Sequence, residues 1–247
     1  GGERGGAAPR AAGPGVGGGP IGEGRGRPWV VEDRAAGPGG SEWALARRGD
    51  EWVVRAGGRV LVSSRAHGSE EALAALALGA ARHPRAVLVG GLGLGFTLRA
   101  VLDRLPRDGR AVVAELVPAL ALWNRERVGH LAGRPLEDPR TRLVQRDVLA
   151  LIREAHGAFD GVLLDVDNGP AALADRANAR LYGDAGVRAC RDALRAGGAL
   201  GVWSAGPDER YRARLERAGL RTAVHAVPAR GGTSRGARHA VFVAVKG

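Results

Sequence analysis

From residue 85 onward, short apolar runs alternate with longer stretches in which apolar residues recur every three or four positions. The short runs predict strands, and the longer stretches predict helices. The predicted strands are residues 87–89, 111–114, 142–144, 159–164, 199–204, 222–227 and 239–245, and the predicted helices are residues 97–105, 119–128, 149–154, 181–194 and 208–218. This alternation predicts an α/β fold with a Rossmann-like, doubly wound, mostly parallel sheet. The last two strands lack an intervening helix, so we expect an antiparallel C-terminal strand pair at one edge.

The pattern differs before residue 85. Apolar runs at residues 42–46, 51–55 and 60–63 are separated by turns that contain glycine, which predicts a small N-terminal β meander. A helix should follow from Ser69, its expected N-cap, to about residue 82. Residues 1–28 consist mainly of Gly, Ala, Pro and Arg without periodicity. We therefore predict a disordered tail at 1–28, the meander at 29–68, and a Rossmann-like catalytic domain at 69–247.

Composition adds limits on location and partners. The chain has 247 residues, a single cysteine, Cys190, and no apolar stretch long enough to cross a membrane. It also shows no secretory signal, so we expect a cytoplasmic protein without a membrane partner. The net charge of +11 makes nucleic acid a possible partner. The arginines are scattered, however, which favours a solvated basic surface over a nucleic-acid groove.

A glycine-rich loop follows the strand at 87–89 and precedes a helix. Its glycines are Gly90, Gly91, Gly93 and Gly95. Glycines at such a position let the backbone turn tightly and approach a ligand beside a helix N-terminus. The alternative is a tight turn that serves only strand–helix packing.

Two carboxylates follow the next two strands. Glu115, beside Leu116, is placed to accept hydrogen bonds from ribose hydroxyls. Asp147 could accept from an adenine amino group while Val148 packs on the ring, although Asp147 could equally be a helix N-cap. Together with the glycine loop, these residues predict a nucleoside-binding domain. NAD is a competing ligand, but the tight loop favours S-adenosylmethionine or a close relative of it.

The strand at 159–164 leads directly into Asp165, Asp167 and Asn168. Ligands of doubly wound folds bind at the carboxyl ends of the strands, and two carboxylates and an amide suit a small-molecule amine substrate there. One carboxylate could deprotonate an attacking amine, and a nearby like charge would raise its pKa. The alternative is a turn at residues 168–170 that only ends the strand.

From about residue 42 to the C-terminus, the chain resembles the spermidine synthase-like (polyamine aminopropyltransferase) family, within the S-adenosylmethionine-dependent methyltransferase-like superfamily. The resemblance rests on the meander, the double-glycine loop, Glu115, Asp147, the loop at 165–170, Tyr182 and the segment at 63–71. It implies an enzyme, a transferase of polyamine biosynthesis, that moves an aminopropyl group from decarboxylated S-adenosylmethionine to a diamine such as putrescine. It also implies catalysis by Asp165 and Asp167, substrate contacts from Glu70, Asp167, Asn168 and Tyr182, no metal, and a possible homodimer.

The chain departs from the family in three places. The family's glycine loop carries an acid that holds the donor's amine, and here the position is Leu92. The acidic loop has the spacing D-x-D instead of D-x-x-D, and Ser69-Glu70-Glu71 replaces a Tyr-His-Glu stretch. These departures leave open an S-adenosylmethionine-dependent methyltransferase that acts on a small molecule or RNA. A binding domain without catalysis is a further alternative.

Overall fold

A computed structural model of the chain describes residues 27–166, 169–170, 180–230 and 237–247. Its centre is a seven-stranded sheet with the order β10-β11-β9-β8-β5-β6-β7. The strands are β5 (Ala86–Gly90), β6 (Arg110–Ala114), β7 (Thr141–Val144), β8 (Phe159–Leu164), β9 (Leu194–Ser204), β10 (Leu220–Pro228) and β11 (Arg238–Lys246). The first five are parallel, whereas β11 is antiparallel to both β9 and β10. The predicted fold class is confirmed, including the antiparallel edge pair.

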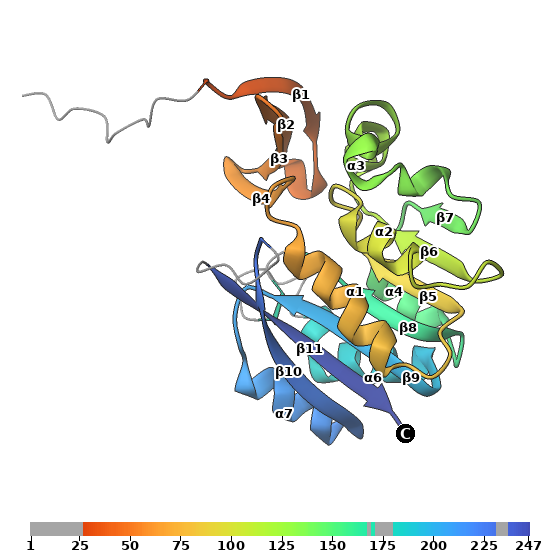
Figure 1. The fold of residues 1–247 in the computed structure, drawn as a ribbon. Coiled ribbons are helices and arrows are strands. Elements are labelled where there is room, and N and C mark those ends of the chain that lie inside the picture. The colour runs from red at the N-terminus through yellow and green to blue at the C-terminus, as the bar shows by residue number, and fades with distance from the viewer. Residues whose placement is uncertain (1–26, 167–168, 171–179, 231–236) are drawn as a thin grey trace, which may run out of the picture.

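Helices cover both faces of this sheet (Figure 1). Helices α1 (Gly68–Ala80) and α2 (Phe96–Leu102) pack on one face, where Leu73 and Leu98 meet Val87 and Val89. The opposite face carries α4 (Val148–Glu154), α6 (Asp184–Ala193) and α7 (Glu209–Arg217).

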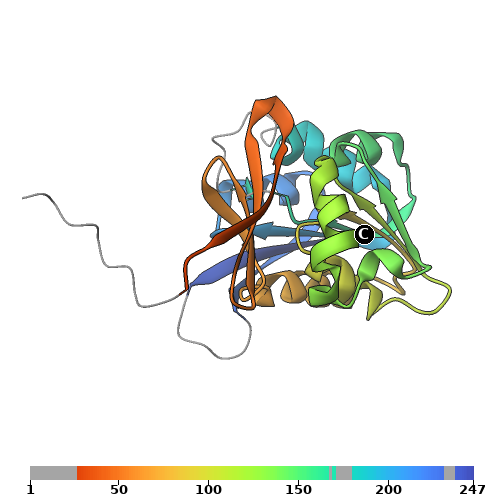
Figure 2. The same cartoon turned by 90° about the horizontal axis from the view of Figure 1, so that it is seen from above.

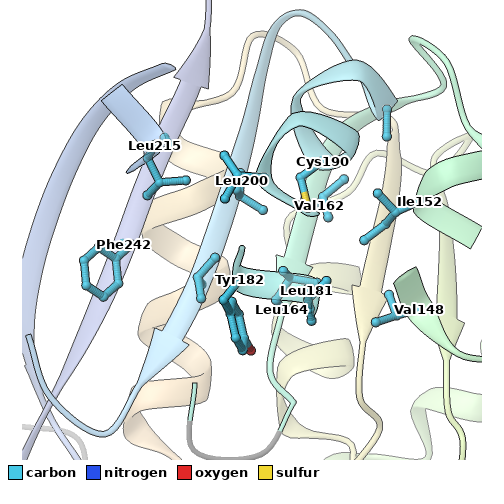
Figure 3. Packing of buried hydrophobic residues seen from close by; sticks show 14 of the residues in the cluster. Val148, Ile152, Val162, Leu164, Leu181, Tyr182, Cys190, Leu200, Leu215 and Phe242 are labelled. Atoms are coloured by element: carbon cyan, nitrogen blue, oxygen red, sulfur yellow. The ribbon is translucent and has the colours of Figure 1, made fainter. Parts of the chain in front are cut away.

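Figure 3 shows the apolar cluster under the second group of helices. Ile152 of α4, Cys190 of α6 and Leu215 of α7 belong to one apolar cluster with Leu200 and Phe242 of the sheet. Cys190 is buried, as expected for a packing residue. A parallel sheet covered on both faces needs strands that are apolar throughout, which explains their continuous apolar runs.

The N-terminal part forms a separate antiparallel sheet with the order β1-β2-β3-β4 (Figures 1 and 2). Its strands are β1 (Val30–Ala36), β2 (Glu42–Arg48), β3 (Glu51–Ala56) and β4 (Arg59–Ser63). Leu45 and Val54 pack against Trp123 at the end of α3 (Pro118–Trp123), which continues as a π-helical turn at Asn124–Val128. The meander is confirmed, and β1 is an additional edge strand that the apolar pattern did not predict.

The start of α1 corrects one prediction. The N-cap of α1 is His67, and Ser69 lies inside the first turn. The Ser69 hydroxyl donates to the Glu70 carboxylate at 2.8 Å, so it does not cap the helix. The predicted tail at 1–28 lies almost wholly outside the described residues. None of the helices in the described part of the chain is long and apolar enough to cross a membrane.

The central strands should dominate stability. Leu163 of β8 is fully buried, whereas Leu122 of α3 is 46 % exposed. We expect Leu163→Ala to lower the free energy of unfolding by about 2–5 kcal/mol, because a cavity remains between the sheet and α1. Leu122→Ala, the matched control, should change it by about 0.5 kcal/mol or less. Urea unfolding followed by circular dichroism measures both. An equal loss in the two variants would contradict this assignment of the core.

Candidate active site

The glycine loop joins β5 to α2 and touches the loop after β8. Gly91 has a φ of +86°, and a Cβ atom there would lie 2.3 Å from the backbone oxygen of Asp165. Hydrogen bonds hold this arrangement: the Asp165 amide donates to the Gly90 carbonyl at 2.9 Å, and the Gly91 amide donates to Ala114 at 2.9 Å. Only glycine therefore fits at position 91, for both steric and conformational reasons.

The π-helical turn after α3 supports the same loop. Asn124 is buried in this turn, and its side-chain amide donates to the Gly93 carbonyl at 2.8 Å. Gly95 faces the same residue, because a Cβ atom there would lie 3.1 Å from Asn124 Oδ1. The irregular turn thus places a polar side chain against the loop, and π-helical turns are frequent at functional sites.

Glu115 lies at the end of β6, beside this loop. Its two carboxylate oxygens accept hydrogen bonds from the backbone amides of Leu92 at 2.9 Å and Val117 at 2.7 Å. The side chain is buried, and the two bonds fix its orientation. The next residue, Leu116, is 55 % exposed. The buried carboxylate of Glu115 is therefore part of the hydrogen-bonded structure of the loop, and Glu115 is not a surface glutamate.

Asp147 and Val148 begin α4 beside β5. Asp147 is the N-cap of α4, and its Oδ1 accepts from the Leu149 amide at 2.9 Å. Val148 is buried next to Gly90. A Cβ atom on Gly90 would lie 2.9 Å from Cγ2 of Val148. The capping role considered for Asp147 is confirmed. A contact with adenine remains a prediction.

Asp165 occupies the carboxyl end of β8. The Thr97 hydroxyl of α2 donates to its Oδ2 at 2.6 Å. Burial disfavours the charged form and raises the pKa of Asp165 to about 6, although the hydrogen bond from Thr97 partly opposes the shift. A carboxylate with this pKa is well suited to accept a proton near neutral pH.

Glu70 brings a second carboxyl group to the same place. It lies in the first turn of α1 and is buried. Burial and the nearby charge of Asp165 raise the pKa of Glu70 to about 8. The two groups titrate together, so at neutral pH the pair carries close to one negative charge instead of two. The sequence predicts Glu70 only as a substrate contact. It does not predict that Glu70 lies close to Asp165.

Leu92 and Tyr182 have their side chains in the core. Leu92 is 3 % exposed and belongs to the apolar cluster with Leu73 and Leu98. Tyr182 is fully buried in the cluster of Figure 3. Its ring packs edge-to-face on Tyr211 at 5.7 Å, and its hydroxyl donates to the Val166 carbonyl at 3.2 Å. Tyr182 thus reaches the acidic loop through its hydroxyl, while most of its surface fills the core.

Two predicted residues, Asp167 and Asn168, lie outside the described residues. Within the described ranges, no three His, Cys, Asp or Glu side chains are placed to hold a metal ion together. Sequence reasoning missed Thr97, Asn124 and the partners of Ser69. The one available signal for Thr97 was a polar residue in the first turn of the helix that follows the glycine loop.

The glycine loop, Glu115 and the acidic pair all lie at the carboxyl ends of parallel strands, where Rossmann-like proteins bind their ligands. Within that class, the chain has the fold of the spermidine synthases. The spermidine synthase from Thermotoga maritima matches with a TM-score of 0.71 and 20% sequence identity, over 88% of this chain and 73% of that chain.

A second spermidine synthase structure, in complex with the transition state analogue AdoDATO, matches with a TM-score of 0.69 and 19% identity, over 88% of this chain and 72% of that chain. No family model and no curated protein matches the sequence. The predicted resemblance is therefore confirmed at the level of the fold. Sequence identities near 20% do not extend it to activity or substrate.

The contact at Gly91 gives a sharp test of the loop. We expect Gly91→Ala to abolish binding of adenosyl nucleosides and to destabilise the protein, because its methyl group would collide with the Asp165 backbone. Gly58 is the matched control, since it also has a positive φ, +77°, but no atom lies within 4 Å of its missing Cβ. Gly58→Ala should cost about 1–2 kcal/mol of backbone strain and leave binding intact. Calorimetry and thermal unfolding measure these effects, and nucleoside binding by Gly91→Ala at wild-type affinity would contradict the proposed site.

Proposed function

We propose that the protein is a spermidine synthase-like transferase that moves an aminopropyl group from decarboxylated S-adenosylmethionine to a diamine such as putrescine. The acidic pair of half-buried Asp165 and buried Glu70 carries this proposal, because Asp165 adjoins the glycine loop on the fold of the spermidine synthases. A neighbour of that fold was solved with a transition state analogue, which supports a transferase with an adenosyl donor.

The donor's nucleoside would lie along the ends of β5, β6 and β7. The glycine loop allows close backbone approach, and Glu115 would bind the ribose hydroxyls. Leu116 would offer apolar surface to the adenine, and the Asp147 carboxylate would accept a hydrogen bond from the adenine amino group. Two observations support this placement of the nucleoside. Leu116 is exposed and can contact a ligand, and backbone amides hold the Glu115 carboxylate in one orientation.

The acceptor diamine would enter beside Asp165. Its ammonium group must lose a proton before the nitrogen can attack, and Asp165 would accept that proton. The neutral nitrogen then forms a bond to the methylene carbon next to the sulfonium. The electron pair of the breaking carbon–sulfur bond goes to sulfur, which leaves as a neutral thioether. Asp167, Asn168 and Glu70 would hold the diamine, while Tyr182 would position the loop through Val166.

Asp165→Asn tests the base directly. The amide keeps the size of the side chain but cannot accept a proton, so we expect kcat to fall at least about 100-fold. Donor affinity, measured by calorimetry, should stay within a few-fold of the wild type. Product formation from putrescine and the decarboxylated donor is followed by mass spectrometry. Full turnover by the variant would exclude Asp165 as the base, and no transfer by the wild type would exclude the reaction.

The hydrogen bond from Thr97 predicts a pH effect. The base must be ionised, so activity is lost as the pH falls through the pKa of Asp165, about 6. Thr97→Val removes a bond that lowers this pKa. The acidic limb of the profile of kcat/KM against pH should therefore move to higher pH. Thr97→Ser keeps the hydroxyl and should leave the limb in place. A limb that stays fixed in Thr97→Val would show that another group controls it.

The second candidate function is methyl transfer from ordinary S-adenosylmethionine to a small molecule or RNA. The buried, apolar Leu92 favours it, since the resemblance implies an amine-holding acid at this position. Calorimetry with the two donors discriminates between the functions. We expect tighter binding of the decarboxylated form, whereas a clear preference for ordinary S-adenosylmethionine would favour the methyltransferase.

A further inference from the structure

Ser69 connects three elements through a single buried oxygen. Its hydroxyl donates to Glu70 Oε2 at 2.8 Å, and it accepts from Trp203 Nε1 at 3.0 Å. The Nδ1 atom of His239 lies 3.0 Å from the same oxygen. Trp203 lies on β9 and His239 on β11, and both strands pack against α1 (Figure 1). The proposed function uses neither His239 nor Ser69.

The hydrogens of this cluster allow two arrangements. A serine hydroxyl has one hydrogen and two lone pairs, and the indole of Trp203 can only donate. When Glu70 is ionised, Ser69 donates to Glu70 and accepts from Nδ1–H of His239. When Glu70 is protonated, it can donate to Ser69, whose own hydrogen then points to an unprotonated Nδ1. Ser69 makes three hydrogen bonds in both arrangements, so reversing the chain loses none of them.

We propose that Glu70, Ser69 and His239 form a proton path that connects the acidic pair to the surface. His239 is only half-buried, which suits the outer end of such a path, whereas Ser69 is buried and Glu70 almost completely so. The path itself is a property of the free protein. Its use in turnover rests on the proposed transferase function.

The surroundings of the two end groups support the path. Glu70 faces Asp165 from the loop after β8 and Glu71 on its own helix, and burial together with these charges raises its pKa to about 8. Burial lowers the pKa of His239, whose ring packs edge-to-face on Trp203 at 4.6 Å. His239 is therefore neutral over the range in which Glu70 titrates, as a relay through its two ring nitrogens requires.

The proposed reaction produces one proton per cycle that must leave a buried site. Asp165 takes this proton from the diamine's ammonium, and both members of the pair are then protonated. Glu70 passes its proton to Ser69, Ser69 passes its own to Nδ1 of His239, and the Nε2 proton of His239 goes to water. The remaining proton then moves from Asp165 to Glu70, whose pKa is the higher of the two. The His239 ring returns to its first tautomer by exchanging protons with water. The pair again holds one proton, on Glu70, and Asp165 is ionised for the next cycle.

Nitrogen-15 NMR of the histidine-labelled free protein tests the path without any substrate. We expect Nδ1 of His239 to be unprotonated below the titration of Glu70 and protonated above it, so that the ring changes tautomer near pH 8. The signal is assigned by its loss in His239→Gln. A single tautomer of His239 across this range in the wild type would overturn the proposal.

Two variants provide matched controls. Glu70→Gln cannot ionise, so its His239 should keep one tautomer across the range in which Glu70 titrates in the wild type, and a change persisting there would also overturn the proposal. Trp203→Phe removes a fixed donor without interrupting the chain, so the tautomer change should persist. Its loss there, in a variant with an unchanged circular dichroism spectrum, would show that the indole and not the relay controls His239.

An activity measurement separates the path from the proposed function. With putrescine and the decarboxylated donor, His239→Gln should lower kcat by about 100-fold with little change in KM, and added imidazole should restore part of the rate. An unchanged kcat would exclude the path from turnover. A wild type without any transfer would defeat the proposed function, while the NMR experiment would still decide whether the path exists.

Discussion

The site depends on the contact between Gly91 and the backbone of Asp165. Gly91, just after β5, lies so close to the Asp165 backbone, just after β8, that position 91 has no room for a Cβ atom. The Asp165 amide donates to the Gly90 carbonyl and holds the two segments together. Because β5 and β8 are parallel neighbours, this one contact fixes the glycine loop and the acidic loop relative to each other. A nucleoside held by the first loop would therefore meet the carboxylates of the second.

The second constraint is the burial of like charges. Asp165 and Glu70 come from different elements and lie close together, Glu70 buried and Asp165 half-buried, so two full negative charges there would be costly. The fold meets this cost by placing a hydroxyl beside each carboxyl group, that of Thr97 beside Asp165 and that of Ser69 beside Glu70. Each hydroxyl sits in the first turn of a helix that covers the same face of the sheet, which links the packing of α1 and α2 to the protonation of the site.

The sequence predicts the sheet well because its strands are buried on both faces and therefore apolar throughout. It fails at β1, where Val30 and Val31 are followed by charged residues of an exposed edge strand. It also misassigns Ser69, since the partners of this hydroxyl, Trp203 and His239, lie 134 and 170 positions away. Glu115 and Asp165 could be predicted because strand ends converge in any parallel sheet. The pairing of Asp165 with Glu70 could not, because it depends on how α1 packs.

The location of the acids bears on the choice of donor. The resemblance implies an acid in the glycine loop, and Leu92 turns into the core there instead. The second carboxyl group beside Asp165 is that of Glu70 on α1. The site is therefore acidic although the glycine loop itself contributes no acid. Ordinary S-adenosylmethionine would bring its own carboxylate toward an ionised Asp165, and like charges about 4 Å apart repel by roughly 4 kcal/mol at an effective dielectric constant of about 20. A donor without that carboxylate would avoid the repulsion, so under the proposed function the electrostatics of the pair would favour the decarboxylated form even though the glycine loop has no acid at Leu92.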